Sequence, residues 1–376
     1  MELKVNRDEF LKGVSLAQSV TITKGTMPIL SHLLIEARDD RIYVFGTDLE
    51  LGMKAEAKAH IVEEGSICLS AKMMADILRE LPAEAEVHFS LEENNQVRIT
   101  CGKICFHMVG LPPEEFPPFP SYDPEDMIHI CSDLLREMII KVGVTVPMVE
   151  QKHLGAPNGA LLEVSKESME MMGTDGHRLS YIKKAGIDEL QNKVRVILPK
   201  KFLNELKKVL DDTENVESVS VGFFENQTIF KVGTVELFSR LLETYFPNIR
   251  PRITKENDKI LTINRHDFRQ SVKRVSIFTE EKEKYIMLKL EHGIIHLSSQ
   301  NLGVGDAEDQ LIVQYDGVPL EIGFNSNFIL DVLNILNGEN IVMEMSDHES
   351  HGVIREADSR DYLYVIMPIK LYEEEF

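Results

Sequence analysis

The chain has 376 residues, of which 43% are hydrophobic, and its 41 basic and 62 acidic residues give a formal net charge of -21. This length is too great for a single hydrophobic core and sufficient for three modest ones. The acidic excess normally argues against nucleic-acid binding, because such affinity comes mostly from Lys and Arg that displace phosphate counterions.

The start of the chain and its cysteines indicate a cytoplasmic, reduced protein. The opening Met-Glu-Leu-Lys-Val is typical of a strand and not of a signal peptide, and no apolar run approaches the roughly 20 residues of a membrane span. The four cysteines form no C-x-x-C pair, and the spacing of Cys101 and Cys105 favours packing over metal ligation. We therefore expect no metal, no cofactor and no membrane contact.

One order of elements occurs three times along the chain. A short alternating strand leads into a first helix, a pair of strands and a second, amphipathic helix follow, another strand comes next, and an apolar residue with a proline ends the unit. In the first unit we expect these elements at 3–6, 33–37 with 42–46, 70–81 and 86–91, with the exit at 116–120. In the second unit the strands and the second helix are expected at 128–130, 161–164 with 169–173, 198–210 and 217–223, with the exit at Phe246-Pro247. The corresponding stretches of the third unit are 261–264, 286–290 with 294–298, 325–337 and 341–346, with the exit at Met367-Pro368.

The second helix of each unit shows the repeat most clearly. Phe202 of the middle unit aligns with Met73 of the first and Phe328 of the third, and further apolar residues follow at helical spacing. A period of roughly 125 residues has the size of a domain and exceeds the 20–50 residues of a solenoid repeat. The sequence therefore predicts three homologous α+β domains at 1–122, 127–250 and 258–376, each with two helices and about eight short strands.

Basic residues concentrate on the predicted helices, whereas acidic residues gather in turns and linkers. The stretch 198–210 carries Lys200, Lys201, Lys207 and Lys208, and the first helix of the third unit carries Arg265, Arg269, Lys273 and Arg274. Solvated helix faces would explain this pattern, and so would a basic helical layer that faces a polyanion. The residues alone leave both interpretations open.

The sequence contains none of the common catalytic signatures, such as a phosphate-binding G-x-x-x-x-G-K-[ST] or a G-x-S-x-G. The stretch His348-Glu349-Ser350-His351 resembles a zinc motif, but its histidines are three residues apart and lie in an expected turn. A solvated turn is the better interpretation of that stretch.

The stretch 174–180 brings Asp175, His177 and Ser180 within a few residues and so suggests a hydrolase. Triad members, however, are assembled from different elements around a strained nucleophile turn, which this stretch lacks. Asp175-Gly176 suits a tight bend between strands, and the first unit has Thr47-Asp48 at the equivalent place. We therefore expect Thr-Asp to serve the fold, and 176–179 to form a structural turn or a binding surface.

Several short motifs accompany the three units. They are Pro28-Ile29-Leu30, Gly46-Thr47-Asp48-Leu49-Glu50, Thr174-Asp175-Gly176-His177-Arg178-Leu179, Phe246-Pro247, Glu321-Ile322-Gly323-Phe324-Asn325, Asp331-Val332-Leu333-Asn334 and Val365-Ile366-Met367-Pro368. Together they resemble the bacterial sliding clamp family, the β subunit of DNA polymerase III, over essentially the whole chain.

This resemblance implies a DNA sliding clamp, a non-catalytic processivity factor that tethers the replicative polymerase. In the family, a head-to-tail homodimer of six DNA-clamp domains forms a ring, with sheets outside and helices inside around double-stranded DNA. A ring holds DNA by topology, so a net-acidic body with a basic lining is physically reasonable. The implied partners are duplex DNA, a second copy of the chain, the polymerase III alpha subunit, the clamp loader and other clamp-binding proteins.

The resemblance also implies three sets of functional residues. The DNA-contacting residues would be Lys24, Lys72, Lys200 and Lys201. A groove for partner peptides would be formed by Thr174, Gly176, His177, Arg178, Leu179, Pro247, Asn325, His351, Val365, Ile366, Met367, Pro368 and Ile369. The dimer interface would place Ile277 and Phe278 against Lys103, Phe106 and Met108 of the partner subunit.

Two stretches depart from the family pattern. Arg250-Pro251-Arg252 has proline where a basic or polar residue is expected, and the chain continues past Leu371 with an acidic tail, which we expect to compete weakly for the groove. Two alternatives remain beside the clamp: a hydrolase that uses Asp175, His177 and Ser180, and a scaffold that binds peptides without encircling DNA.

Overall fold

The computed structural model describes residues 1–22, 25–188, 190, 192–213, 215–249, 257–280 and 284–369. These residues form two compact units, one of Met1–Leu135 with Lys201–Leu241, the other of Arg136–Lys200 with the chain from Leu242 on. The second repeat therefore contributes strands to both units, because its two halves extend the sheets of its neighbours in sequence.

The first unit contains one large antiparallel sheet. Strand β16 of the second repeat pairs with β4 of the first, so the sheet runs β8-β7-β6-β1-β4-β16-β15-β14-β9, with β2, β3 and β5 joined beside β4. Its elements are β1 (Glu2–Asn6), α1 (Arg7–Gln18), β2 (His32–Arg38), β3 (Arg41–Thr47), β4 (Leu51–Glu63), β5 (Gly65–Ser70), α2 (Ala71–Glu80), β6 (Glu86–Leu91), β7 (Gln96–Cys101), β8 (Ile104–Val109), β9 (Ile128–Cys131), α4 (Lys200–Asp212), β14 (Ser218–Phe223), β15 (Gln227–Val232) and β16 (Val235–Arg240).

The second unit contains two sheets. The larger runs β13-β10-β11-β12-β24-β23-β22-β17 and the smaller runs β20-β19-β18-β21. Helix α3 (Ser132–Gly143) leads from the first unit into these elements: β10 (Gly159–Val164), β11 (Ser168–Thr174), β12 (Arg178–Ala185), β13 (Val194–Pro199), β17 (Lys259–Asn264), α6 (Arg265–Val275), β18 (Tyr285–Glu291), β19 (Ile294–Asn301), β20 (Gly305–Ile312), β21 (Leu320–Asn325), α7 (Ser326–Ile335), β22 (Asn340–Met345), β23 (Gly352–Glu356) and β24 (Tyr362–Ile366).

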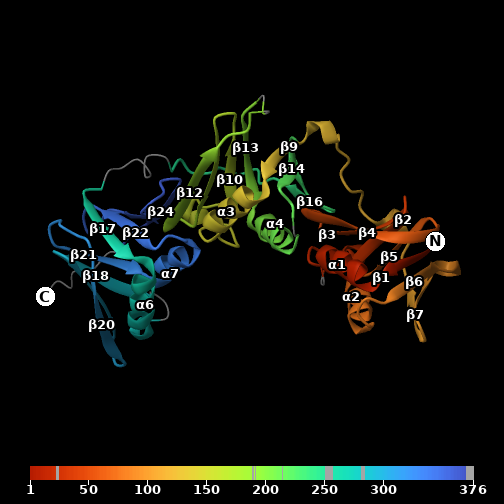
Figure 1. Ribbon diagram of the computed structural model, residues 1–376, viewed down its shortest axis with the longest axis horizontal. Coiled ribbons are helices and arrows are strands. Elements are labelled where there is room, and N and C mark those ends of the chain that lie inside the picture. The colour runs from red at the N-terminus through yellow and green to blue at the C-terminus, as the bar shows by residue number, and fades with distance from the viewer. Residues whose placement is uncertain are drawn as a thin grey trace. The chain divides into compact units, whose positions relative to one another are not determined.

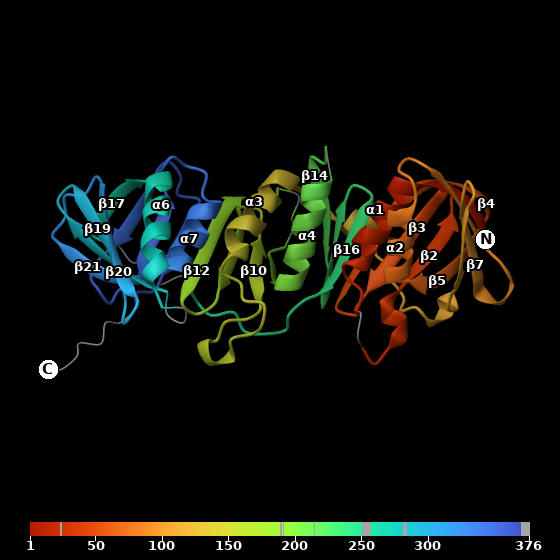
Figure 2. The same cartoon turned by 90° about the horizontal axis from the view of Figure 1, so that it is seen from below.

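The first helices of the outer repeats begin at the same kind of cap. The Asn6 side chain accepts hydrogen bonds from the backbone N–H groups of Asp8 and Glu9, and Asn264 accepts one from that of Asp267. Each helix packs against the second helix of its own repeat, α1 with α2 and α6 with α7 (Figures 1 and 2). Repeated local sequence thus produces repeated supersecondary structure.

Glycine in the repeated Gly-Thr-Asp motif permits a helix to lie close to a strand. A side chain at Gly46 would overlap the backbone carbonyl of Ala17 in α1, and one at Gly173 would meet Val146 at 2.6 Å, just beyond α3. The first and second repeats therefore use the same glycine for the same packing.

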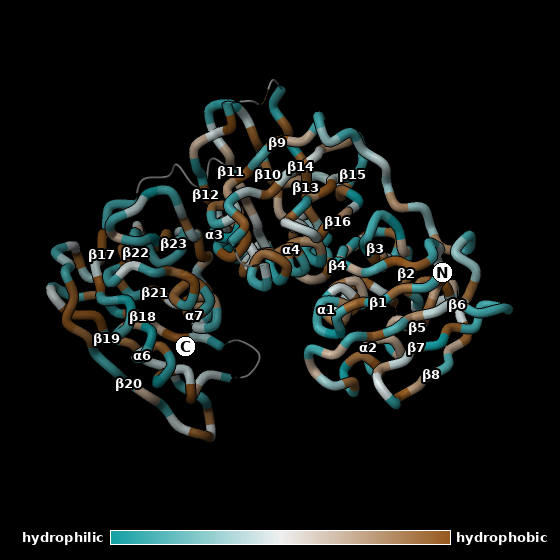
Figure 3. Tube along the Cα trace, turned by 45° about the vertical axis from the view of Figure 1, so that its right-hand side comes forward, coloured by the Kyte–Doolittle hydropathy of each residue, from teal (hydrophilic) through white to brown (hydrophobic). Residues whose placement is uncertain are grey.

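The hydrophobic core follows the alternation of the strands. Strand β2 alternates half-buried and buried residues from His32 to Ala37, and Figure 3 shows hydrophobic residues spread over the strands of both units. None of the described helices has the length and apolar composition needed to cross a membrane.

The predicted alignment of the second helices agrees with their first residues, Ala71, Lys200 and Ser326, but the aligned side chains differ in burial. The side chain of Met73 is 55% exposed, whereas Met74 is fully buried. In α7 likewise, Ile329 is buried and Phe328 only partly so. Neighbouring apolar residues such as Met73 and Met74 suit a helical stripe equally well, so periodicity alone could not choose between them.

Candidate functional site

The turn between β11 and β12 forms one end of the candidate site. The Thr174 hydroxyl donates to the Arg178 carbonyl at 2.8 Å and accepts from the Gly176 N–H at 3.0 Å, while the Asp175 carboxylate accepts from the N–H groups of His177 and Arg178. Gly176 has φ +90°, and a side chain there would meet Leu154 at 2.6 Å. The turn is therefore fixed by its own side chains and requires glycine.

The first repeat has the same turn. The Thr47 hydroxyl donates to the Leu51 carbonyl and accepts from the Leu49 N–H, and the Asp48 carboxylate accepts from the N–H groups of Glu50 and Leu51. This geometry supports the expectation that Thr-Asp serves the fold in both repeats.

Strand pairing brings the turn next to the last strand. Leu179 pairs with Val365, Arg178 pairs with Ile366, and the Met367 N–H donates to the His177 carbonyl at 2.9 Å. An apolar floor lies behind this pairing, made of Leu161, Met172, Leu179, Ile197, Phe246, Ile249, Val353 and Val365, with Tyr181, Leu242 and Leu363 packed against it. The hairpin of one repeat and the end of another thus share one buried apolar cluster, and we use the name groove for this cluster together with the expected groove residues around it.

Arg178 links this turn to helix α7. Its guanidinium donates to the Asp175 carboxylate at 2.8 Å and to the Asp331 carboxylate at 2.6 Å, and it donates to the Tyr364 hydroxyl at 3.2 Å. Burial would lower the pKa of Arg178, but Tyr364 and the two carboxylates outweigh burial and hold the pKa above its ordinary value. Arg178 therefore stays charged and rigidly placed.

Phe328 completes this wall. The Arg178 guanidinium lies 4.3 Å from the centre of the Phe328 ring, and the His177 ring stacks on the same ring at 6.4 Å. The family motifs did not indicate Phe328, Asp331 or Tyr364 as groove residues. Phe328 and Asp331 stand three residues apart in the motif-bearing helix, a spacing that places both on one face and could have signalled their role.

The expected groove residues differ in accessibility. His177 is exposed, and Gly176, Pro247, Met367, Pro368 and Ile369 are partly exposed, whereas Thr174, Leu179, Val365, Ile366 and His351 are buried. Alternation along β24 places Ile366 on the face opposite Val365, where it lies near Gly352 and not in the apolar floor. Asn325 caps α7 by accepting from the Asn327 N–H at 3.0 Å.

The side chains of the three residues of the alternative hydrolase, Asp175, His177 and Ser180, contact other side chains and not one another. The Ser180 hydroxyl is buried against the Tyr362 hydroxyl at 3.0 Å, the His177 ring stacks on Phe328, and the Asp175 carboxylate holds Arg178. In these described contacts, neither His177 nor Asp175 is placed as a base for the Ser180 hydroxyl. Among the described residues, no cluster of His, Cys, Asp and Glu is placed to hold a metal ion.

The lysines expected to contact DNA lie in different surroundings. Lys72 is exposed on α2, and Lys201 is exposed but paired with Asp48. Lys200 donates to the Gly143 carbonyl, and burial, with a smaller effect of Arg178, lowers its pKa. Lys24 and the linker at 250–252 lie outside the described residues, as does the tail from Lys370.

The residues expected at the dimer interface lie on or beside edge strands. Phe106 and Met108 belong to β8, which lies at one edge of the first unit's sheet, and Lys103 is in the turn before this strand. Ile277, which is 74% exposed, and Phe278 belong to a short helix that packs against β19 and β20. Strand β20 lies at the edge of its sheet. Met108 is buried in the core of its own domain.

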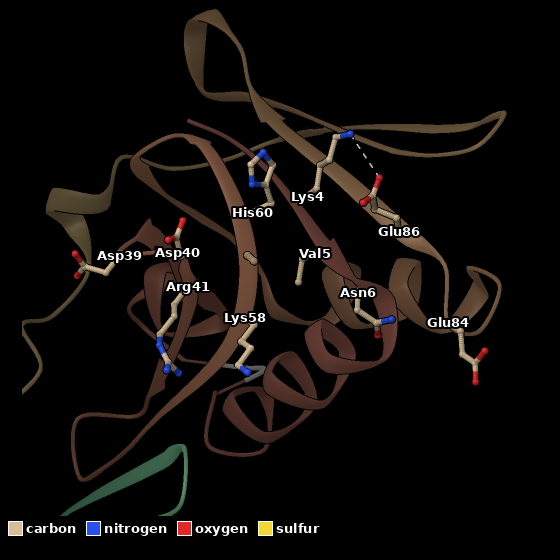
Figure 4. A pocket seen from close by; sticks show the side chains of 11 residues that line it. Lys4, Val5, Asn6, Asp39, Asp40, Arg41, Lys58, His60, Glu84 and Glu86 are labelled. Carbon is tan, nitrogen blue, oxygen red and sulfur yellow. Dashed lines mark ion pairs between the residues drawn. The ribbon is translucent and has the colours of Figure 1, made fainter.

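A separate hollow of about 700 Å³ lies over β1 and β4 (Figure 4). Lys4 and Glu86 point toward each other across it and form an ion pair at 3.6 Å. Its lining is mostly acidic, basic and polar side chains, with Val5 and Ala59 as the apolar members, so it differs in kind from the groove.

Three tandem α+β domains, of which the second extends the sheets of both its neighbours, define a protein of the DNA-clamp class. The chain belongs to the DNA polymerase III beta subunit family. It matches the N-terminal domain of that family over residues 1–120, the central domain over 129–248 and the C-terminal domain over 251–370.

Individual relatives agree with this assignment. The beta sliding clamp of Pseudomonas putida is 28% identical over 99% of this chain and 100% of its own length, and that of Caulobacter vibrioides is 29% identical with the same coverage. The crystal structure of the sliding clamp of Bartonella birtlesii bound to griselimycin is 30% identical, with a TM-score of 0.93 over 99% of this chain and 100% of that one. The DNA polymerase III subunit beta of Pseudomonas aeruginosa has a TM-score of 0.92 at 27% identity, over 99% and 100% of the two chains. The predicted family and fold class are confirmed.

Proposed function

We propose that this protein is a DNA sliding clamp, a non-enzymatic processivity factor that encircles double-stranded DNA and tethers the replicative polymerase. The full-length match to all three domains of the beta subunit family carries this proposal. The domains would extend over 1–122, 127–250 and 258–376, and the active form would be a head-to-tail homodimeric ring in the cytoplasm with the helices toward DNA.

The charge distribution is compatible with holding DNA by topology. The chain has a net charge of -21, so the body would repel DNA in general, while exposed cations such as Lys72 on α2 and Lys273 on α6 would face the phosphates. Lys24, Lys72, Lys200 and Lys201 remain the proposed contacts. Lys201 would contact a phosphate from beside Asp48, with which it is paired, because its ammonium group has further N–H donors.

A closed ring can be distinguished from an ordinary binding protein by a topological experiment. A clamp loader places the protein on nicked circular DNA. One sample is then passed directly through a size-exclusion column, and in a parallel sample the loaded DNA is linearised before the column. We expect retention on the circle and loss from the linear DNA. Equal retention on both would refute encirclement and favour a scaffold, and so would equal loss from both.

The groove would bind extended peptide segments of the polymerase alpha subunit, the clamp loader and other partners. The supporting observation is the apolar floor around Leu179, Val365 and Phe246, bordered by the fixed Arg178 and by partly exposed Met367. Such a floor accepts apolar anchor side chains, and methionine adapts to different ones. Met367→Ala should weaken binding of a synthetic alpha-subunit peptide, whereas the distant Met73→Ala should leave the affinity unchanged.

A further inference from the structure

The domains of one chain are joined at two junctions by the pairing of strands. At the first junction, β4 of the first repeat pairs with β16 of the second, and Lys54 lies opposite Glu236. At the second junction, β12 of the second repeat pairs with β24 of the third, and Tyr181 lies opposite Leu363. The proposed ring needs one more kind of junction, between the third domain of one copy and the first domain of the other. The edge strands β20 and β8 are available for it.

The residues of β20 that correspond to β4 and β12 follow from strand pairing. In each repeat, counting starts at the residue just before the second helix, which is Ser70, Pro199 or Asn325. The same steps across the sheet then give the rows Leu34-Phe45-Lys54, Leu161-Met172-Tyr181 and Met287-Ser298-Glu308. Glu308 therefore corresponds to Lys54 and Tyr181.

The residues of β8 that correspond to β16 and β24 follow from the turn before the strand and from the chain after it. Gly102 and Gly233 have φ +57° and +58° in equivalent turns, and Cys105 and Glu236 follow them at the same distance in sequence. At one further spacing, the N–H groups of Leu111, Leu242 and Ile369 donate to equivalent carbonyls, those of Cys68, Ile197 and Gly323. Cys105 therefore corresponds to Glu236 and Leu363.

The two junctions inside the chain also share a second opposed pair. Gly52 lies opposite Phe238 at the first junction, and Leu179 lies opposite Val365 at the second. By the same correspondence, Asp306 of β20 takes the place of Gly52 and Leu179, and His107 of β8 takes the place of Phe238 and Val365. Each junction thus has two opposed pairs of side chains on one face of the sheet.

In the proposed ring, this register places Glu308 opposite Cys105 of the partner subunit, and Asp306 opposite His107 of the partner subunit. Directly opposed residues of an antiparallel pair have Cβ atoms about 4.5–5.5 Å apart, so the four side chains would form one cluster. All four are exposed in the single chain, whereas their neighbour Met108 is buried. Cysteine, histidine and carboxylate side chains are the residue types that bind metal ions.

Cys105 and His107 already have the spacing of two ligands of one ion. The Cys105 Sγ and the His107 Nε2 are 3.4 Å apart. A sulfur at about 2.3 Å and a nitrogen at about 2.0–2.1 Å from a tetrahedral zinc ion stand roughly 3.5 Å from each other. Within the described residues of one chain no third ligand joins these two, so the set of four would be completed only by the carboxylates of the other copy.

Arg98 would balance the charge of such a site. It lies opposite His107 on the neighbouring strand β7, and a hydrogen bond with Cys105 raises the pKa of its guanidinium. A thiolate and two carboxylates carry three negative charges, so a bound Zn²⁺ leaves one of them uncompensated. The guanidinium supplies the remaining positive charge.

We propose that each junction between the two copies of the ring holds a Zn²⁺ ion, bound by Cys105 and His107 of one copy and by Asp306 and Glu308 of the other. Because neither copy supplies four ligands alone, this site rests on the proposed homodimer. A closed set of four protein ligands is typical of a structural zinc ion, which joins elements and leaves no position open for chemistry. The ion would link the copies at the position where the Lys54–Glu236 ion pair links two domains of one chain.

Cobalt(II), which replaces zinc in tetrahedral sites, reports on this coordination. The full chain is freed of metal with a chelator and titrated with Co²⁺, and thiolate ligation gives a charge-transfer band in the near ultraviolet. We expect the band to saturate at about one ion per chain, because a head-to-tail dimer has two identical junctions. Cys105→Ser should abolish the band, whereas Cys131→Ser, at another exposed cysteine, should leave it unchanged. Absence of the band in the wild type, or its persistence in Cys105→Ser, would overturn the proposal.

Two complementary variants test whether the ligands come from different copies. The Cys105→Ala/His107→Ala chain keeps both carboxylates, and the Asp306→Asn/Glu308→Gln chain keeps the thiol and the imidazole. After subunit exchange in an equal mixture, about half of the dimers contain both chains, and each of these has one intact junction out of two. The mixture should therefore show about a quarter of the wild-type band. A band of wild-type strength in either variant alone, or no band in the mixture, would contradict a shared site.

Sedimentation separates failure of the metal site from failure of the ring. At a Zn²⁺ concentration about ten times the Kd of the site, each junction gains a factor of about ten, so the dissociation constant of the dimer should fall about a hundred-fold relative to protein with a chelator. Cys105→Ser should show no such shift. A dimer that gives no cobalt band, or that zinc does not tighten, would refute the metal site and leave the ring intact. A chain that stays monomeric with and without Zn²⁺ would refute the homodimer, and the site with it.

Discussion

Replacing Asp331 with alanine should loosen the groove, because it removes one of the two carboxylates that hold Arg178. The Asp331 carboxylate lies 2.6 Å from the Arg178 guanidinium, and that of Asp175 lies 2.8 Å away. The variant keeps Asp175, so Arg178 retains one partner and is not left as an uncompensated charge. What is lost is the link between the turn and helix α7.

The size of the effect follows from exposure. A hydrogen bond to a charged group contributes about 1.5–3 kcal/mol when buried, and an exposed ion pair contributes about 0.2–1 kcal/mol. The Arg178 side chain is 11% exposed and that of Asp331 is 43% exposed, so solvent screens one partner only. We expect the free energy of unfolding to fall by about 1–2 kcal/mol.

Urea unfolding followed by circular dichroism measures this loss, and Asp76→Ala provides a matched control. Asp76 pairs with Arg79 at 2.9 Å, but both side chains are about half exposed, at 53% and 50%. That pair should contribute at most about 0.5 kcal/mol. If Asp331→Ala destabilises the protein no more than Asp76→Ala, or leaves the affinity for an alpha-subunit peptide unchanged, Arg178 does not couple α7 to the groove.

Three further predictions concern packing, pH and assembly. Gly46→Ala should destabilise the protein by about 3 kcal/mol through overlap with the Ala17 carbonyl, whereas Gly13→Ala, where a Cβ would meet neighbours at 3.7 Å, should raise the free energy of unfolding by up to about 1 kcal/mol; equal effects in thermal unfolding would contradict this. Burial alone would raise the pKa of Glu137, but hydrogen bonds and charges of Lys141 and Lys184 outweigh it and hold the pKa below its ordinary value of 4.5. The stabilising effect of Glu137 is therefore present above that pH and lost as the pH falls through the folded-state pKa, so wild type and Glu137→Gln should converge at acidic pH, and a constant difference in urea midpoint would refute the linkage. Ile277→Asp should shift the proposed dimer toward monomer in analytical ultracentrifugation, while Val62→Asp, at a side chain 58% exposed on β4, should not; an unchanged sedimentation coefficient for Ile277→Asp would exclude that residue from the proposed interface.

The sequence by itself determined the repeated architecture. Alternating strands, helices with buried apolar faces and the Gly-Thr-Asp motif are local patterns, and local geometry alone gives them their period and caps. The family motifs likewise named the turn at 174–179 and the strand at 365–367, which the structure brings together through the pairing of β12 with β24. Periodicity did not decide which of Met73 and Met74 is buried, because two adjacent apolar residues fit one stripe equally well.

Only the tertiary structure decided which side chains act together. The contact of Arg178 with Asp331 joins positions far apart in sequence. The helical pattern of α7 suggests a core position for Phe328, whereas the fold places its ring beside Arg178 and His177. The ion pair of Lys54 with Glu236 likewise appears only when β4 pairs with β16, although neither residue is notable in its own strand. Strand pairing is a long-range choice driven by burial of whole faces, so a linear pattern fixes each strand but not its neighbour.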